Sequence, residues 1–129
     1  MIKEKDFKKA LDLIDSADNI LVTTHARPDG DGCGSVAALC RGLSALGKKT
    51  LPVMLTHVPQ WYEFLFDTPP KILGDDIAVE QLGQPDMVII IDTNSYGQLP
   101  GLEEFLKQND KPVLTIDHHV TSDNLGDVE

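Results

Sequence analysis

The sequence predicts an α/β domain with a doubly wound parallel sheet of at least four strands and helices on both faces. Two observations support this prediction. Short, apolar, β-branched runs alternate with segments whose apolar residues recur at helical three- and four-residue steps. Three of the apolar runs also end in a polar cluster, and the carboxyl ends of parallel strands meet at one edge of a sheet.

The expected helices follow from amphipathic spacing. We expect a helix over residues 3–15, a second over 35–46, a short helical turn over 77–82 and a further helix over 102–108. Gly47 follows the second of these, at the position where a glycine commonly ends a helix.

The expected strands are short and apolar. They cover residues 20–24, 50–55, 87–91 and 112–116, and the run over 87–91 is the most apolar, so we place it at the centre of the sheet. Residues 57–70 carry most of the aromatic side chains and show no regular pattern, which predicts an irregular segment.

Length and charge narrow the classes of function. The 129 residues suit one domain, and the net charge of −10 argues against broad electrostatic binding to duplex nucleic acid. It does not exclude short nucleotides whose charge is met by metal ions. No secretory leader pattern is present and no apolar stretch reaches the roughly 18 residues that span a membrane, so we expect a cytoplasmic protein.

Three polar clusters follow three of the strands. The first holds an imidazole and two carboxylates within seven residues, the second begins with an aspartate, and the third is a run of one aspartate and two histidines. Such ligands suit manganese, iron, cobalt, zinc or magnesium, with manganese or magnesium favoured where oxygens dominate. The candidate metal ligands are His25, Asp29, Asp31, Asp92 and His118.

A pair of divalent ions would explain so many ligands. Two metals bridged by one carboxylate can hold a hydroxide between them and stabilise the attacking and leaving oxygens of a phosphate ester. Asp92 is the natural bridging residue, because it ends the most apolar strand.

Each residue also has an ordinary structural explanation. Asp29 and Asp31 are residue types that favour turns and helix N-caps, and Asp92 is able to cap a turn after its strand. His57 stands outside the pattern and is expected at the surface. Cys33 and Cys40 share one helix face, which is typical of core packing.

The glycine-rich segment over residues 30–35 has a second interpretation as a dinucleotide-binding loop. It fails the G-x-G-x-x-G pattern because Ser35 occupies the last position, and residues 48–56 contain no acid for a ribose. The glycines are expected to let the backbone turn sharply and to leave room for phosphate near a helix N-terminus. The aromatic segment over 60–66 is expected to cover a sheet edge, although aromatic rings also stack on nucleobases.

The three clusters together resemble the first three motifs of the DHH phosphoesterase superfamily. The segments are His-Ala-Arg-Pro-Asp-Gly-Asp-Gly-Cys-Gly-Ser over 25–35, Asp-Thr-Asn over 92–94 and Asp-His-His over 117–119. The first is most similar to the branch of nanoRNases and pAp phosphatases. The resemblance covers roughly residues 15–125, and it rests on three ordered motifs at strand ends.

The resemblance implies a role for each matched residue. His25 and Asp29 would bind one metal, Asp31 and His118 the other, and Asp92 would bridge both. Four more residues gain roles from the third and first motifs. Asp117 would orient the tandem histidines, His119 would contact the scissile phosphate or transfer a proton, and Arg27 and Ser35 are candidates for substrate binding. A solvated loop position is the alternative for Arg27.

The implied function is a metal-dependent hydrolase. It would cleave short oligonucleotides (nanoRNA) or 3′,5′-bisphosphorylated adenosine by attack of a metal-bridging hydroxide, with two Mn²⁺ ions expected and Mg²⁺ or Co²⁺ as alternatives. Related activities are a cyclic-dinucleotide phosphodiesterase, a single-strand exonuclease and a manganese pyrophosphatase. A non-catalytic nucleotide- or metal-sensing domain is the alternative from another class, and a homodimer is compatible with the sequence.

The family pattern also includes a fourth aspartate motif and a smaller C-terminal substrate domain. Asp123 and Asp127 lie too close to the third motif to supply that aspartate. We therefore expect residues 1–129 to be an incomplete N-terminal DHH-type catalytic domain that binds the second metal weakly and turns over little substrate by itself.

Overall fold

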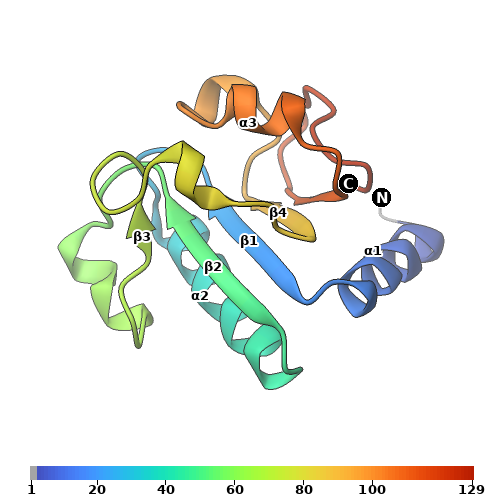
Figure 1. Cartoon of the computed structure of the whole chain (residues 1–129), viewed down its shortest axis with the longest axis horizontal. Helices are drawn as coiled ribbons and strands as arrows, with labels where there is room; N and C mark the ends of the chain where they lie inside the picture. The colour runs from blue at the N-terminus through green and yellow to red at the C-terminus, as the bar shows by residue number, and fades with distance from the viewer. Residues whose placement is uncertain (1–2) are drawn as a thin grey trace.

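A five-stranded, all-parallel sheet organises the chain. The computed structural model describes residues 3–129, and the strand order is β3-β2-β1-β4-β5 (Figure 1). The chain therefore adds strands on one side of β1 and then on the other, which confirms the predicted doubly wound sheet. The strands are β1 (Asn19–Thr24), β2 (Lys49–Met54), β3 (Lys71–Ile72), β4 (Met87–Ile91) and β5 (Val113–Ile116).

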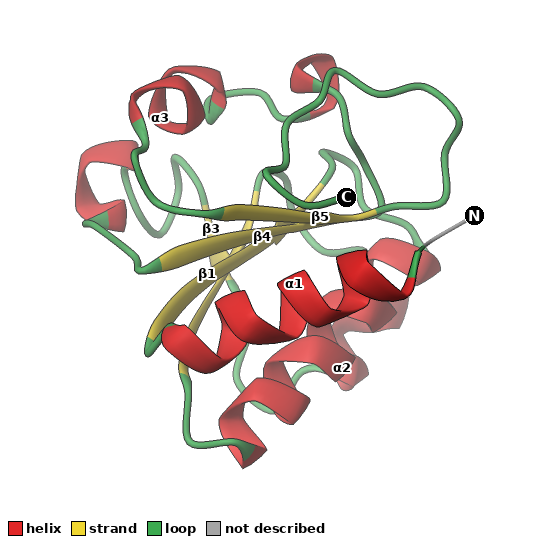
Figure 2. Cartoon of the chain, turned by 90° about the vertical axis from the view of Figure 1, so that its right-hand side faces the viewer, coloured by secondary structure: helices red, strands yellow, loops and turns green. Residues whose placement is uncertain are grey.

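Helices cover both faces of this sheet, as predicted. Figure 2 shows α1 (Glu4–Ser16) and α2 (Gly30–Ala45) on one side and α3 (Glu103–Gln108) on the other. Three short 3₁₀ helices complete the chain, and they are η1 (Gln60–Leu65), η2 (Val79–Leu82) and η3 (Tyr96–Gln98). Among residues 3–129, no helix is long and apolar enough to cross a membrane.

The alternation of side chains along each strand divides the core into two layers. Every residue of β4 is buried, because its odd and even positions face different layers. The layer under α1 and α2 includes Ile20, Val22, Val36, Leu43, Met87 and Ile89. The layer under α3 includes Leu21, Val88, Ile90, Leu99, Leu102 and Leu106.

The register of three neighbouring strands, β1, β4 and β5, creates the functional edge. β1 is the central strand of the sheet, and β4 lies beside it rather than at the centre as predicted. Thr24 pairs with Ile91, and Ile91 pairs with Ile116, so β1, β4 and β5 all end at the same level. The next residues along the chain are His25, Asp92 and Asp117.

The start of α2 differs from the prediction. The helix begins at Gly30 rather than at residue 35, because the Asp29 carboxylate accepts the Gly32 N–H at 2.9 Å and caps the first turn. The predicted sharp glycine turn is also wrong, since Gly30, Gly32 and Gly34 lie outside the set of positive-φ glycines. At Gly32 the reason for glycine is proximity: a Cβ there would lie 2.9 Å from Thr24 Oγ1.

Two further elements depart from the sequence-based reading. Residues 57–70 were expected to be irregular but contain η1, and the two-residue strand β3 was not foreseen because it is too short for a periodic signal. Gly47 follows α2 with φ of 79°, which confirms the predicted helix end. Cys33 is buried and Cys40 packs against the same core layer, as expected.

Candidate metal centre

The candidate site lies at the carboxyl edge of β1, β4 and β5 and at the N-terminus of α2. Asp92 is at its centre, with only 5% of its surface exposed. Its φ of 60° places it in the left-handed region, which aspartate tolerates better than most residues. This turn ends β4 and leaves the carboxylate between the histidines of the first and third motifs.

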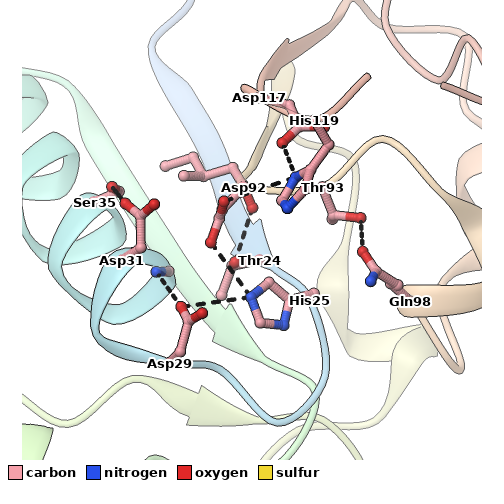
Figure 3. A network of polar contacts seen from close by, with 12 residues as sticks. Thr24, His25, Asp29, Asp31, Ser35, Asp92, Thr93, Gln98, Asp117 and His119 are labelled. Carbon is pink, nitrogen blue, oxygen red and sulfur yellow. Dashed lines mark hydrogen bonds and ion pairs between the residues drawn. The ribbon is translucent and has the colours of Figure 1, made fainter. Parts of the chain in front are cut away.

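His25 belongs to a first group of ligand atoms. Its Nδ1 lies 2.8 Å from the carbonyl oxygen of Ala26, and because a carbonyl only accepts, Nδ1 carries the proton. The lone pair of Nε2 then faces two carboxylate oxygens, Asp92 Oδ2 at 3.4 Å and Asp29 Oδ1 at 3.7 Å (Figure 3). Three acceptor atoms therefore converge on one point.

His118 belongs to a second group on the other side of Asp92. Its Nε2 lies 3.1 Å from Asp92 Oδ1 and 3.5 Å from Asp31 Oδ2. The two oxygens of Asp92 consequently face two different imidazoles. This is the arrangement expected of a carboxylate that bridges two ions.

Neighbouring contacts hold the carboxylates of the first motif in place. The Gly32 N–H that caps α2 through Asp29 also lowers the pKa of Asp29. This hydrogen bond outweighs the opposing effect of burial, and the nearby His25 lowers the pKa further by a smaller amount. Ser35 donates its hydroxyl to Asp31 Oδ1 at 3.3 Å. Both acids are thus oriented from within α2.

Asp117 acts on the tandem histidines. Its Oδ1 accepts the backbone N–H of His118 at 2.9 Å and lies 2.6 Å from His119 Nδ1. The hydrogen bond to Asp117 is the main cause of a raised pKa at His119. The other oxygen, Asp117 Oδ2, is buried and has no hydrogen-bond partner among the described residues.

Two predicted residues lie apart from the ligand clusters. Arg27 is exposed with φ of 52°, and its backbone N–H donates to Thr56 Oγ1 at 2.6 Å. His57 has 80% of its side chain exposed and pairs with Asp75 at 2.7 Å, which confirms the predicted surface position.

The sequence analysis assigned no role to several residues that support the site, although Thr93 and Asn94 stand in its second motif. Thr24 donates its buried hydroxyl to the Ile91 carbonyl at 2.8 Å and so ties the ends of β1 and β4 together (Figure 3). Thr93 hydrogen-bonds Gln98, and Asn94 Oδ1 accepts the Leu125 N–H at 3.0 Å. The one signal for them in the sequence is their position beside the ends of strands.

The acids that follow the third motif have other partners. Asp123 accepts the Tyr96 N–H and Asp127 accepts the Val113 N–H, each at 2.9 Å. These carboxylates fix the chain that returns along β5. Neither carboxylate belongs to the ligand groups that converge among residues 3–129.

The donor set fits divalent metal ions. Two groups have ligand atoms that all lie within 4.8 Å of one another, one of them His25, Asp29 and Asp92, the other Asp92, Asp117, His118 and His119. So many carboxylates around a buried aspartate are unfavourable without a cation. Imidazole and carboxylate together suit Mn²⁺, Co²⁺, Zn²⁺ or, with more oxygens, Mg²⁺.

Comparison with known proteins agrees with this geometry. The chain is 33% identical over 109 residues to a bifunctional oligoribonuclease and PAP phosphatase NrnA from Thermus thermophilus, covering 83% of this chain and 30% of the relative. It is 31% identical over 126 residues to the protein of that name from Mycoplasma pneumoniae, covering 92% of this chain and 36% of the relative. The chain thus spans about a third of the length of these relatives.

The fold comparison points the same way. A crystal structure of an exopolyphosphatase-related protein from Bacteroides fragilis superposes with a TM-score of 0.88 at 18% sequence identity. It covers 99% of this chain and 38% of the other, and at this identity it speaks for the fold alone. The family model described as DHH family, N-terminal domain, matches residues 19–128. With three motifs converging at one sheet edge, this chain belongs to the DHH family.

Proposed function

We propose that residues 1–129 form the N-terminal catalytic domain of a metal-dependent phosphoesterase. Its substrates would be short oligonucleotides (nanoRNA) and 3′,5′-bisphosphorylated adenosine. Membership of the DHH family and the names of the relatives support this proposal. The chain spans only about a third of the length of those relatives, so their names alone do not assign it an activity. The proposal of a catalytic domain and of its activity therefore depends also on the residues of the site.

One observation carries the proposal most directly. Asp92 is buried, and its two carboxylate oxygens lie 3.4 Å from His25 Nε2 and 3.1 Å from His118 Nε2. A structural aspartate at a strand end needs backbone N–H partners rather than two imidazoles. The arrangement instead favours two ion sites that share Asp92, with His25 and Asp29 on one side and Asp31 and His118 on the other.

The ions, with Mn²⁺ as our first choice, would supply positive charge that activates water and neutralises the phosphate. The remaining residues would bind and orient the substrate. Asp117 lies 2.6 Å from His119 Nδ1, and this hydrogen bond raises the pKa of His119, which would favour a ring that donates a proton to a phosphate oxygen. Arg27 and Ser35 lie on either side of the Asp29–Asp31 segment, where they would contact a phosphate.

Titration with Mn²⁺ tests this proposal. We expect two bound ions per chain by calorimetry and by electron paramagnetic resonance, and an Asp92→Asn variant that has lost both. Asp67→Asn is the matched control, because Asp67 is exposed and pairs with Arg41 at 3.2 Å, away from the site. Binding of two ions by the Asp92→Asn variant would overturn the shared site.

Substrate tests then separate a hydrolase from a sensing domain. We expect Mn²⁺-dependent release of phosphate from 3′,5′-bisphosphorylated adenosine or of mononucleotides from a dinucleotide, at a low rate, and no release by Asp92→Asn. Metal-dependent binding without any hydrolysis would instead support a sensing domain.

A further inference from the structure

The exposed face of η1 presents two aromatic rings that the fold does not use. Residues three apart in a 3₁₀ helix lie on the same side, because this helix has three residues per turn. Tyr62 and Leu65 form one such pair, and both pack against the core layer under α2. Trp61 and Phe64 form the other pair, with 70% and 79% of their surfaces exposed.

Packing explains only the first pair. Tyr62, Leu65 and Phe66 pack against the core layer under α1 and α2, so packing accounts for these side chains. Trp61 and Phe64 bury little in the described structure, although large aromatic side chains gain most by leaving water. The rings of Trp61 and Tyr62 pack edge-on, with their centroids 6.0 Å apart, and this contact helps to orient the Trp61 ring.

Tyr62 connects this aromatic face to the candidate metal centre. A Cβ placed on Gly30 would lie 3.2 Å from the Tyr62 hydroxyl and 3.3 Å from the ring, so the tyrosine packs directly on the Gly30 backbone. Gly30 is the residue between Asp29 and Asp31, which face the two groups of ligand atoms. Tyr62 thus links η1 to the first motif, and its ring is also the one that the Trp61 ring meets.

We propose that Trp61 and Phe64 form a stacking surface for a nucleobase of the substrate whose phosphate is bound at the metal centre. The inference rests on the proposed function and extends it to base recognition. Stacking on an aromatic ring tolerates any base, since every base has a π-face. The surface would favour nucleotides over phosphate esters that lack a base. It would also give a protein with a net charge of −10 a means of binding nucleotides that does not depend on charge.

Fluorescence gives a direct test, because Trp61 is the one tryptophan in the sequence. With Mg²⁺ present, 3′,5′-bisphosphorylated adenosine should quench the emission in a saturable way, and ribose 5-phosphate should bind without quenching. By calorimetry, Trp61→Ala should weaken nucleotide binding about 5- to 150-fold, the range that loss of one stacked base implies. Trp61→Phe should restore most of the affinity.

Controls separate the aromatic surface from general apolar binding. Phe7→Ala changes another exposed aromatic residue, 59% exposed on α1, and should leave nucleotide affinity unchanged. Circular dichroism of each variant should match the unmodified chain, since neither Trp61 nor Phe64 contributes to the core. Phe64→Ala should weaken nucleotide binding and leave ribose 5-phosphate binding unchanged.

The outcomes of these experiments distinguish the stacking surface from the phosphoesterase function on which it rests. Metal-dependent binding of both ligands, with no quenching and no effect of Trp61→Ala, would overturn the stacking surface and leave the phosphoesterase proposal intact. Quenching by the nucleotide that persists in Asp92→Asn and without Mg²⁺ would overturn the phosphate-binding metal centre and support the aromatic surface. No binding of either ligand would overturn both.

Discussion

The imidazole Nε2 of His118 lies 3.1 Å from Oδ1 of Asp92, although 26 residues separate the two in sequence. The contact follows from the register of β4 and β5, which pairs Ile91 with Ile116 and so ends both strands at one level. The other oxygen of Asp92 faces His25, which follows the next strand. Neighbouring parallel strands thereby assemble a site from three distant segments.

The two ion sites should be separable by mutation. We expect His25→Ala to weaken one step of Mn²⁺ binding and His118→Ala to weaken the other, each by about 100-fold, since loss of even an outer-shell partner costs about 10- to 100-fold. Calorimetric titration of both variants measures the two steps. If either variant lost both steps equally, the assignment of the histidines to separate ions would be wrong.

Substitution by alanine at two glycines of α2, Gly32 and Gly34, should change the stability of the protein in opposite directions. Gly32→Ala places a Cβ 2.9 Å from Thr24 Oγ1, a buried group that is fixed by its bond to Ile91, and should cost about 1–3 kcal/mol. Gly34→Ala meets nothing within 4 Å and should stabilise the helix by about 0.5–1 kcal/mol. Urea unfolding of the two variants checks both signs, and equal effects would refute the packing argument.

Asp86 should make stability depend on pH. Its Oδ2 accepts the N–H groups of Asn19 at 2.9 Å and Asp18 at 3.1 Å, and these bonds lower its pKa, the Asn19 bond most. A carboxyl with a lowered folded pKa stabilises the fold above its unfolded value of about 3.9, and this contribution disappears as the pH falls through the folded value.

Asp86→Ala should therefore lower the free energy of unfolding at neutral pH. The difference from the unmodified chain should shrink as the pH falls below about 4. Urea unfolding between about pH 7 and about pH 3 measures this trend. A difference that stays constant over the whole range would show that the charge of Asp86 contributes nothing.

The two cysteines should be unreactive and unpaired in the folded protein. They lie seven residues apart on α2, about 10 Å along the axis, beyond the roughly 7 Å that a disulfide spans between Cα atoms. Burial raises the pKa of both Cys33 and Cys40. Thiol labelling should be slow in buffer, slower at the buried Cys33 than at the partly buried Cys40, and fast in urea. Rapid labelling in buffer would contradict this.

Four of the five strands, their alternation with helices and the candidates for the site could be predicted from the sequence. The run from Met87 to Ile91 could be recognised because a strand buried on both faces is apolar at every position. The side chains at its end could be grouped with those of β1 and β5 because parallel strands end at one edge.

Three features could be read only from the folded chain: the start of α2, the histidine that each oxygen of Asp92 faces, and the aromatic residues of η1 that remain exposed. The first depends on the cap at Asp29 and on the close approach of Gly32 to Thr24. The second depends on a left-handed turn at Asp92, and the third on the packing of Tyr62 over Gly30. The contacts of Gly32 with Thr24 and of Gly30 with Tyr62 join different elements of the fold, whereas local spacing in a sequence reports only which residues share a face.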